Sequence, residues 1–286
     1  MFDVIIIGAG PSGVSASLYT KRANLNTLIV YNNATSLEKA ELIENYYGFE
    51  NGINGNDLYE SGINQAKNLG VELVEDEVLE VVKINDAFTV KTTKNEFNSK
   101  AVILATGNKK KSPQIQGIKE FEGKGISYCA ICDGFFYRGQ DVAVLGNGNY
   151  AINETMDLIH VARSVTILTN GEEEPEIREE NVSVNSKKIK EILGENRVEK
   201  IEFEDNTNIN ISAVFIAEGV AGSSDFAKKI GAIVDKQNIQ VNENMETNVE
   251  GLYACGDCIG GLLQVSKAVY DGTKAGLATI QFIRKN

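Results

Sequence analysis

Two cysteines near the middle of the chain have the spacing of a redox-active pair. Cys129 and Cys132 are separated by two residues, and Asp133 directly follows them. Two thiols at this spacing can form a reversible disulfide in a small loop, and a helix that starts at such a pair raises the thiolate fraction. Asp133 could give or take a proton while the disulfide exchanges electrons, which is the role of a general acid–base. We therefore predict dithiol–disulfide chemistry at Cys129, Cys132 and Asp133.

Other interpretations of the cysteines have to be weighed. A zinc site needs about four ligands, and the chain has 4 cysteines and a single histidine, His160. Cys255 and Cys258 repeat the spacing, but Gly256 and Asp257 between them form a turn of the kind that faces a cofactor. We expect Cys255 and Cys258 to be packed side chains, with a second redox centre as the alternative, and we expect no metal site.

A glycine-rich turn near the N-terminus has the pattern of a dinucleotide-binding site. The apolar run from Val4 to Ile7 leads directly into the GxGxxG sequence of residues 8–13. Between a strand and a helix, the first glycine permits the tight turn, the second lets the backbone approach a pyrophosphate, and the third allows close helix packing. The N–H groups and the dipole at the helix start attract the anion. The predicted contact residues are Gly8, Gly10, Pro11, Ser12 and Gly13.

The strand after this turn lacks one expected feature. An Asp or Glu at its end usually binds the ribose of the dinucleotide, but the chain has Tyr31, Asn32 and Asn33 there. We expect Asn32 or Asn33 to take over this contact.

The order of elements predicts an α/β fold of two Rossmann-like dinucleotide-binding domains, the second inserted in the first. Short Val/Ile-rich runs typical of buried parallel strands alternate with helical stretches, and strand, glycine turn and helix recur at residues 141–162. We assign residues 1–112 and 239–286 to a discontinuous first domain, and residues 113–238 to a second domain that carries the cysteine pair. The predicted strands are residues 4–7, 27–30, 101–105, 142–145, 165–168 and 213–217.

Length and charge limit the classes of function. The 286 residues suffice for two domains of roughly 150 residues each. A net charge of -12, from 28 basic and 40 acidic residues, disfavours nucleic acid and anionic membrane surfaces as partners. The start of the chain has no basic leader, and no apolar run approaches the roughly 18 residues needed to span a bilayer. We expect a cytoplasmic protein, in which a close cysteine pair is not a structural staple.

Six segments, taken together and in order, carry a resemblance to a known family. They are residues 8–13, 43–46, 105–107, 127–134, 146–151 and 251–257. In these segments, and over nearly its whole length, the chain resembles the low-molecular-weight thioredoxin reductases. The resemblance implies a homodimer with one FAD per subunit and thioredoxin as the protein substrate.

The resemblance also implies roles for single residues. Cys132 would face the flavin, Cys129 would attack thioredoxin, and Asp133 matches the acid of the family. In the family the two domains rotate, so that the dithiol alternates between the flavin and thioredoxin. The implied FAD contacts outside the first glycine turn are Asn45, Val78 near the adenine, Ala105, Thr106, Gly107, Gly256, Asp257 and Gln264.

The second glycine turn, residues 146–151, keeps the outline GxGxxA, but the residues after the next strand do not suit NADPH. The 2′-phosphate of NADPH needs Arg or Lys there, whereas residues 169–174 read Thr-Asn-Gly-Glu-Glu-Glu. This departure resembles the ferredoxin-dependent flavin thioredoxin reductases and implies reduced ferredoxin as the electron donor. Ferredoxins are usually acidic, so we expect docking at Lys109-Lys110-Lys111, with a solvated loop as the alternative.

The leading prediction is a flavin-dependent thioredoxin reductase that passes electrons from FAD to the Cys129–Cys132 disulfide and on to thioredoxin. Three alternatives stay open. NADPH or NADH could drive the same reaction, a thiol oxidase could run electrons from a dithiol to oxygen, and a flavoprotein could remain as a binding or sensing module.

Overall fold

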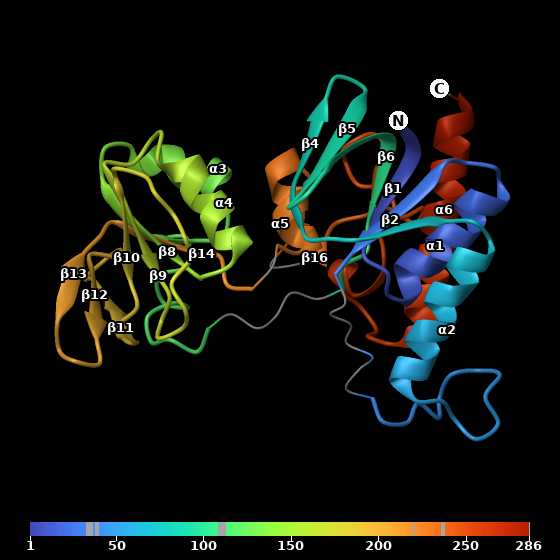
Figure 1. Ribbon diagram of the computed structural model, residues 1–286, viewed down its shortest axis with the longest axis horizontal. Coiled ribbons are helices and arrows are strands. Elements are labelled where there is room, and N and C mark those ends of the chain that lie inside the picture. The colour runs from blue at the N-terminus through green and yellow to red at the C-terminus, as the bar shows by residue number, and fades with distance from the viewer. Residues whose placement is uncertain (33–36, 38–39, 108–112, 220, 236–237, 286) are drawn as a thin grey trace. The chain divides into compact units, whose positions relative to one another are not determined.

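The computed structural model describes residues 1–32, 37, 40–107, 113–219, 221–235 and 238–285 (Figure 1). The chain forms two compact units: unit 1 comprises residues 1–109 and 222–286, and unit 2 comprises residues 110–221. Each unit has its own parallel sheet. Within the described ranges, no helix combines the length and the apolar character that a membrane span requires.

Unit 1 is built on a sheet with the strand order β3-β2-β1-β6-β5-β4. The strands β1 (Phe2–Ile7), β2 (Thr27–Tyr31) and β3 (Glu72–Glu75) run parallel, and β6 (Glu96–Leu104) runs parallel to β1. The second half of β6 also pairs in parallel with β17 (Leu252–Ala254). Its first half pairs antiparallel with β5 (Ala87–Thr92), and β5 pairs antiparallel with β4 (Val78–Ile84). Five parallel strands therefore end at one edge of this sheet, where dinucleotide sites form in such folds.

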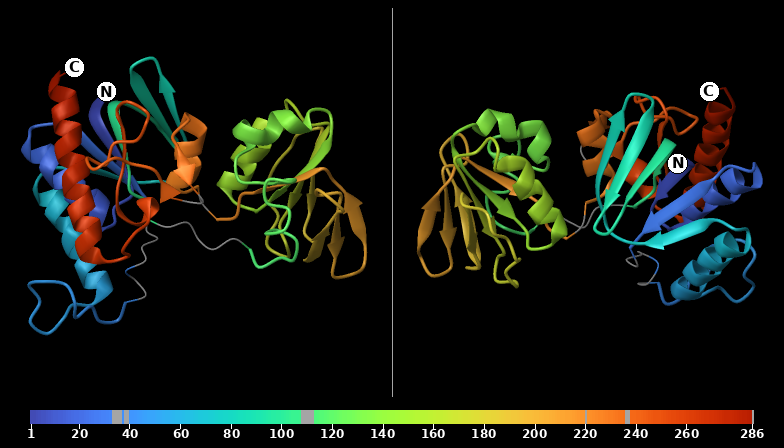
Figure 2. Two further views of the ribbon diagram at one scale, coloured as in Figure 1. Left: turned by 180° about the vertical axis from the view of Figure 1, so that it is seen from behind. Right: turned by 45° about the horizontal axis from the view of Figure 1, so that its top comes forward.

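Three helices cover one face of this sheet: α1 (Pro11–Arg22), α2 (Gly55–Asn68) and α6 (Val265–Lys285). Figure 2 shows the blue α1 and the red α6 side by side in both views. Alternate residues of the strands, such as Val4, Ile6 and Ile103, are fully buried against the helices. A strand places every second side chain on the same face, which explains why these short apolar runs form the core. The remaining short elements of unit 1 are α5 (Ser223–Ile230), β15 (Val234–Asp235), β16 (Asn238–Ile239) and the 3-10 helix η3 (Gly256–Ile259).

Asp76, between β3 and β4, is a buried carboxylate that connects this segment to the end of β5 by hydrogen bonds. It is 7% exposed and accepts hydrogen bonds from the hydroxyls of Thr92 and Thr93 and from the N–H groups of Glu77 and Lys94. Burial alone would raise the pKa of Asp76, but these hydrogen bonds outweigh it and lower the pKa.

Replacing Asp76 by asparagine should destabilise unit 1 by about 1–3 kcal/mol at neutral pH, because an amide cannot accept from all four donors. A lowered pKa means that the carboxylate stabilises the fold above the unfolded-state value of about 4, and that this contribution is lost as the pH falls through the folded-state value. Urea unfolding of both proteins between pH 7 and pH 3 checks this. A stability difference that stays constant or widens on acidification would contradict it.

Unit 2 is a five-stranded parallel sheet with the order β10-β9-β8-β14-β7. Its strands are β7 (Ile126–Ser127), β8 (Asp141–Leu145), β9 (Ser164–Leu168), β10 (Val182–Asn185) and β14 (Ala213–Ile216). A separate antiparallel sheet contains β11 (Ile189–Leu193), β12 (Lys200–Phe203) and β13 (Asn208–Asn210). The helical elements are α3 (Ala130–Asp133), the 3-10 helix η2 (Gly134–Tyr137) and α4 (Asn149–Leu158).

The predicted α/β fold with two Rossmann-like sheets is confirmed, and all six predicted strands are present. Their ends agree within two residues, except that the strand predicted from residue 101 begins at Glu96. The predicted return to the first domain at residue 239 is wrong, because the chain returns to unit 1 near residue 222. The segment between holds α5, which packs against β4, and β15, which pairs with β16. A short helix after a buried strand has the same pattern in either domain, so the sequence alone placed this segment in the wrong one.

Candidate functional site

The first glycine turn is shaped by the packing of its own backbone. Gly8 has a φ of 109°, and a Cβ there would lie 2.4 Å from the carbonyl oxygen of Ala105. A Cβ on Gly13 would lie 1.9 Å from the carbonyl oxygen of Gly8. Both positions therefore require glycine for the turn and for the contact between α1 and the strands.

Gly10 differs from these two glycines in a way that points to a ligand. It precedes α1 with no side-chain cap, and a Cβ on it would meet no atom within 4 Å. Its φ of -68° would allow any residue. The open space lies over the first N–H groups of α1, which have no partner within the helix and attract anions. This geometry fits the pyrophosphate of a dinucleotide.

The other predicted cofactor residues of unit 1 follow the carboxyl ends of neighbouring parallel strands. Asn32 follows β2, Val78 comes just after β3, residues 105–107 follow β6, and Gly256 and Asp257 follow β17. Backbone bonds from Gly8 N to Val30 O (2.8 Å), from Asp76 N to Tyr31 O (2.9 Å) and from Ala105 N to Ile7 O (2.8 Å) connect the ends of β1, β2, β3 and β6. The sheet therefore gathers them along one edge. Asn33, the alternative to Asn32, lies outside the described residues.

Thr106 after β6 is fixed by Ser223, the first residue of α5, where the chain has returned to unit 1. Its backbone N–H donates to Ser223 Oγ at 3.1 Å, the two hydroxyls are 2.9 Å apart, and Ser223 N–H donates to Thr106 Oγ1 at 2.8 Å. Gly107 follows with a φ of 73° and open space at its Cβ position. The sequence did not predict Ser223, because its partner lies more than a hundred residues away.

The Gly256–Asp257 segment is held against α1 and α6. Lys267 Nζ donates to Gly256 O (3.0 Å) and Gly260 O (2.7 Å) and pairs with Asp271 at 2.7 Å, while Asp271 accepts from Gly256 N–H at 3.2 Å. A Cβ on Gly256 would lie 2.5 Å from the Ser12 hydroxyl, so this segment adjoins the first glycine turn.

Two other predicted contact residues of unit 1 bind each other. The surroundings of a third, Asp257, shift the pKa of its carboxyl group. Asn45 donates to Gln264 Oε1 at 2.9 Å. Burial raises the pKa of Asp257, Lys267 partly opposes this shift, and Asp271 adds to it. Lys267 and Asp271 were not predicted as site residues.

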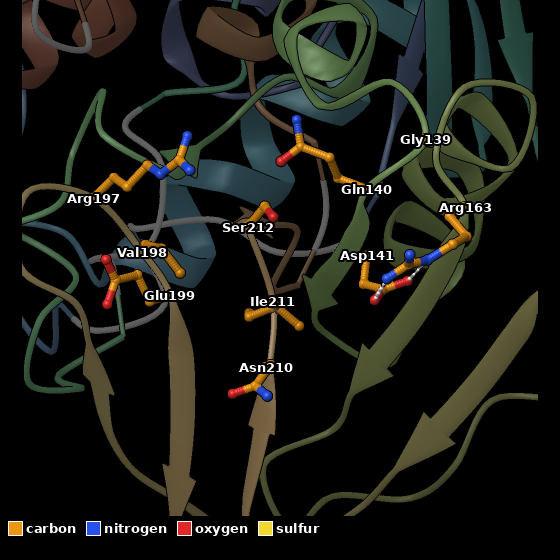
Figure 3. Close-up of a pocket in the computed structure, with 10 residues that line it drawn as sticks. All are labelled: Gly139, Gln140, Asp141, Arg163, Arg197, Val198, Glu199, Asn210, Ile211 and Ser212. Carbon is orange, nitrogen blue, oxygen red and sulfur yellow. Dashed lines mark hydrogen bonds and ion pairs between the residues drawn. The ribbon is translucent and has the colours of Figure 1, made fainter.

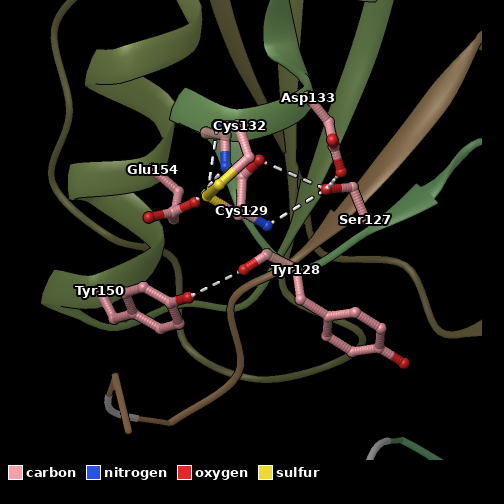
Figure 4. Close-up of a disulfide and its surroundings, with 8 residues drawn as sticks. Ser127, Tyr128, Cys129, Cys132, Asp133, Tyr150 and Glu154 are labelled. Atoms are coloured by element: carbon pink, nitrogen blue, oxygen red, sulfur yellow. Dashed lines mark hydrogen bonds between the residues drawn. A yellow bond between two sulfur atoms is a disulfide. The ribbon is translucent and has the colours of Figure 1, made fainter. Parts of the chain in front are cut away.

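In unit 2, Cys129 and Cys132 form a disulfide at the start of α3 (Figure 4). Cys129 is 3% exposed and its Sγ accepts the N–H of Cys132 at 3.2 Å, whereas Cys132 is exposed. Ser127 Oγ donates to the Asp133 carboxylate at 2.7 Å and accepts the Cys129 N–H at 3.1 Å. Asp133 is thus tied to the backbone of the pair through one hydroxyl, as a group that moves protons there would need.

The second cysteine pair has a different environment. Cys255 and Cys258 are free and buried, and Cys258 Sγ donates to Leu104 O and Cys255 O. Burial raises the pKa of Cys255 well above its usual range and that of Cys258 to about 11. Both remain neutral thiols at neutral pH, which suits packed side chains. The described residues contain no group of three or more His, Cys, Asp or Glu placed to hold a metal ion.

The second glycine turn copies the backbone of the first but not its electrostatics. Residue 146 has to be glycine, because a Cβ there would lie 2.2 Å from the carbonyl oxygen of Ala217. Gly148 precedes α4 and provides no side-chain cap. The loop after β9 reaches this turn, since Asn147 donates to Glu173 O at 3.3 Å. Burial, followed by the charge of Glu172, raises the pKa of Glu218.

Residues 172–174 are exposed glutamates, so the loop that reaches this turn is acidic. The Lys188 side chain lies 3.0 Å from the position that a Cβ on Gly171 would take, which puts a basic residue beside the loop.

Figure 3 shows a pocket of about 320 Å³ in unit 2, near the start of β8. Arg163 on its wall is paired with Asp141, and hydrogen bonds from Arg163 and Ser164 lower the pKa of Asp141 to about 2. Arg197 and Glu199 bring one charge of each sign to the opposite wall. The lining includes neither glycine turn nor the dithiol, and we assign it no function.

The two units together define a class of protein: a disulfide oxidoreductase in which one dinucleotide-type unit carries the dithiol and the other holds the open glycine turn. Residues 2–272 match the family model described as pyridine nucleotide-disulphide oxidoreductase, and the chain belongs to this family. Within it, the chain is a thioredoxin reductase-type flavin oxidoreductase that binds FAD.

Three similar proteins cover the whole chain. The thioredoxin reductase of Bacillus subtilis (strain 168) is 34% identical over 306 residues, which cover 100% of this chain and 96% of that protein. The crystal structure of the atypical thioredoxin reductase TRi from Desulfovibrio vulgaris Hildenborough is 37% identical with a TM-score of 0.92, and covers 100% of this chain and 99% of that chain. A ferredoxin-flavin thioredoxin reductase from Clostridium acetobutylicum is 29% identical with a TM-score of 0.73 and the same coverage of both chains.

Proposed function

We propose that this enzyme reduces thioredoxin with electrons that it takes from reduced ferredoxin. The observation that carries the choice of donor is the acidic loop at the second glycine turn, where Glu172 acts on Glu218 and Glu173 lies against Asn147. A nicotinamide dinucleotide phosphate would bring further negative charge into this loop, where like charges repel it, and the repulsion is least screened at the partly buried Glu218. The similarity to a ferredoxin-flavin thioredoxin reductase supports the proposal.

In this proposal FAD is held by unit 1 through the predicted residues at the carboxyl edge of its sheet, including Gly10, Asn45, Thr106, Asp257 and Gln264. The flavin supplies the conversion from one-electron to two-electron chemistry. The driving force is sufficient, because a donor near about -400 mV and a thioredoxin near about -270 mV differ by roughly 6 kcal/mol over two electrons.

The side chains of unit 2 carry the second half of the reaction. Cys132 is the exposed cysteine of the pair and receives the electrons, which opens the bond to Cys129. Asp133 and Ser127 move a proton to and from the pair through their 2.7 Å hydrogen bond. Cys129 then attacks the disulfide of thioredoxin. The domain rotation and the homodimer of the family belong to the same proposal.

An anaerobic spectral titration of the FAD-loaded enzyme tests the donor. We expect stoichiometric reduced ferredoxin to bleach the flavin band within the mixing time, and NADPH or NADH to leave it unchanged, because both would bring negative charge to the turn beside Glu172 and Glu218, NADPH the more so through its 2′-phosphate. Rapid bleaching by either nicotinamide would overturn the ferredoxin proposal but not thioredoxin reduction itself. The lysines that we expect to bind ferredoxin, residues 109–111, lie outside the described residues.

A nicotinamide-dependent thioredoxin reductase is the second candidate, because the uncapped start of α4 at Gly148 retains the backbone of a phosphate site. NADH lacks the 2′-phosphate and therefore suffers less repulsion than NADPH. If this candidate is correct, the titration should show bleaching by NADH at lower concentrations than by NADPH.

A further inference from the structure

A buried carboxylate that the proposed reaction does not use lies beside the dithiol. Glu154 in α4 is 1% exposed, and its Oε2 accepts the N–H of Ala130, the residue directly after Cys129, at 2.7 Å. Figure 4 shows its side chain reaching from α4 toward the disulfide, while Ser127 and Asp133 lie on the other side of the pair. A buried carboxylate is costly unless hydrogen bonds compensate its charge, and the bond from the Ala130 N–H is compensation of this kind.

The local backbone would otherwise favour negative charge on Cys129. Its Sγ accepts the Cys132 N–H at 3.2 Å at the start of α3. Cysteine pairs with this placement have stabilised thiolates, and a stabilised reduced form makes the disulfide an oxidant rather than the dithiol a reductant. A protein that must reduce other disulfides needs the opposite bias.

We propose that the negative charge of Glu154 opposes a thiolate on Cys129 and so keeps the reduced pair a strong electron donor. The inference rests on the redox cycle of the pair in the proposed function. In that cycle two electrons from the reduced flavin break the S–S bond, and the sulfurs take either two protons from solvent or one proton with one negative charge retained. Glu154 disfavours the second product, which raises the free energy of the reduced pair. Glu154 is thus a positioning residue that acts through the electrostatics of the dithiol.

Other titratable and charged groups belong to the elements that meet at the pair. They are Tyr128, Asp133 and Tyr137 from its own segment, Tyr150, Glu154 and Asp157 from α4, and Arg197, whose charge acts on Tyr137. Asp133 is engaged by Ser127, and Tyr150 donates to Tyr128 O at 3.5 Å. Glu154 differs from them because it binds the backbone N–H next to the sulfur of Cys129.

The test compares Glu154→Gln with the wild-type holoenzyme in dithiothreitol and glutathione redox buffers, with acid quenching and peptide mass spectrometry of Cys129 and Cys132. Glutamine keeps the acceptor for Ala130 N–H and removes only the charge. We expect the equilibrium to shift at least about tenfold toward the dithiol at pH 8, which is a potential about 30 mV more positive. The shift should shrink as the pH falls, because both proteins then hold two protonated thiols.

Two further variants separate charge from packing. Glu179→Gln removes an exposed carboxylate from the same unit and should leave the equilibrium unchanged. Glu154→Asp keeps the charge with a shorter side chain and should stay close to wild type, so it also serves if the glutamine variant folds poorly. An unchanged potential in Glu154→Gln, a shift independent of pH, or an equal shift in Glu154→Asp would overturn the inference. These measurements use neither ferredoxin nor thioredoxin; a pair that redox buffers never reduce would instead overturn the proposed function.

Discussion

Replacing Cys132 by serine should lower thioredoxin reduction by more than about a thousandfold, because loss of a covalent intermediate leaves no comparable route. Cys132 is the exposed sulfur of the disulfide, and the hydroxyl of serine cannot form an S–S bond with Cys129. The variant should still bind FAD, since its cofactor residues lie in unit 1. Photoreduction of the flavin without oxygen, followed by mixing with oxidised thioredoxin, measures the effect independently of the natural donor. Full retention of thioredoxin reduction would show that electrons take another path.

The chain offers a matched control for this substitution. Cys258→Ser changes a cysteine of the same spacing class, but that thiol is 2% exposed and donates to Leu104 O, a bond that a serine hydroxyl can also make. We expect Cys258→Ser to retain activity within about threefold, since a hydroxyl replaces a thiol with little change in volume. A loss as large as that of Cys132→Ser would assign Cys258 to a second redox centre.

Gly10→Val should weaken FAD binding by about a hundredfold or more, because lost charge-assisted hydrogen bonds cost about 1.5–3 kcal/mol. The open space beside Gly10 is filled by no protein atom within 4 Å, so valine would occupy only the volume that the pyrophosphate needs. The fold should survive, since the φ of -68° at this residue suits valine. Flavin absorbance after dialysis, together with the circular dichroism of the apoprotein, checks both expectations.

Gly62→Ala is the control for this prediction. Gly62 lies in α2, and its added Cβ would make an ordinary contact with the Val14 side chain at 3.6 Å, without filling the space beside Gly10. It should bind FAD as wild type does. If Gly10→Val also retained flavin of native affinity, the cofactor would have to lie elsewhere.

The parts of the fold that the sequence predicted are those with a local physical cause. The apolar runs from Val4 to Ile7 and from Val142 to Leu145 are buried on both faces of parallel sheets, and this requirement is visible in the residues themselves. Gly8, Gly13 and Gly146 are required because neighbouring carbonyl oxygens leave no room for a Cβ. Such requirements leave a recognisable spacing, so both glycine turns could be predicted.

What the sequence could not predict depends on contacts between distant residues. Ser223 binds Thr106 across more than a hundred residues of sequence, and α5 joins unit 1 through its contacts with β4. Glu154 did leave a signal that sequence reasoning missed: in α4 it shares the buried stripe of Ala151, Thr155 and Leu158. A single acidic residue on an apolar helical stripe indicates a specific partner, because an unused charge would not be placed there.

The bonds between Thr106 and Ser223 also bear on how such a chain could have arisen. They hold the point where the polypeptide leaves unit 1 and the point where it comes back within one hydrogen-bond length, 2.8 to 3.1 Å. A gene segment added at a surface turn disturbs its host least when its two ends meet. A chain consisting of unit 1 alone would therefore need only a short bridge in place of residues 110–221.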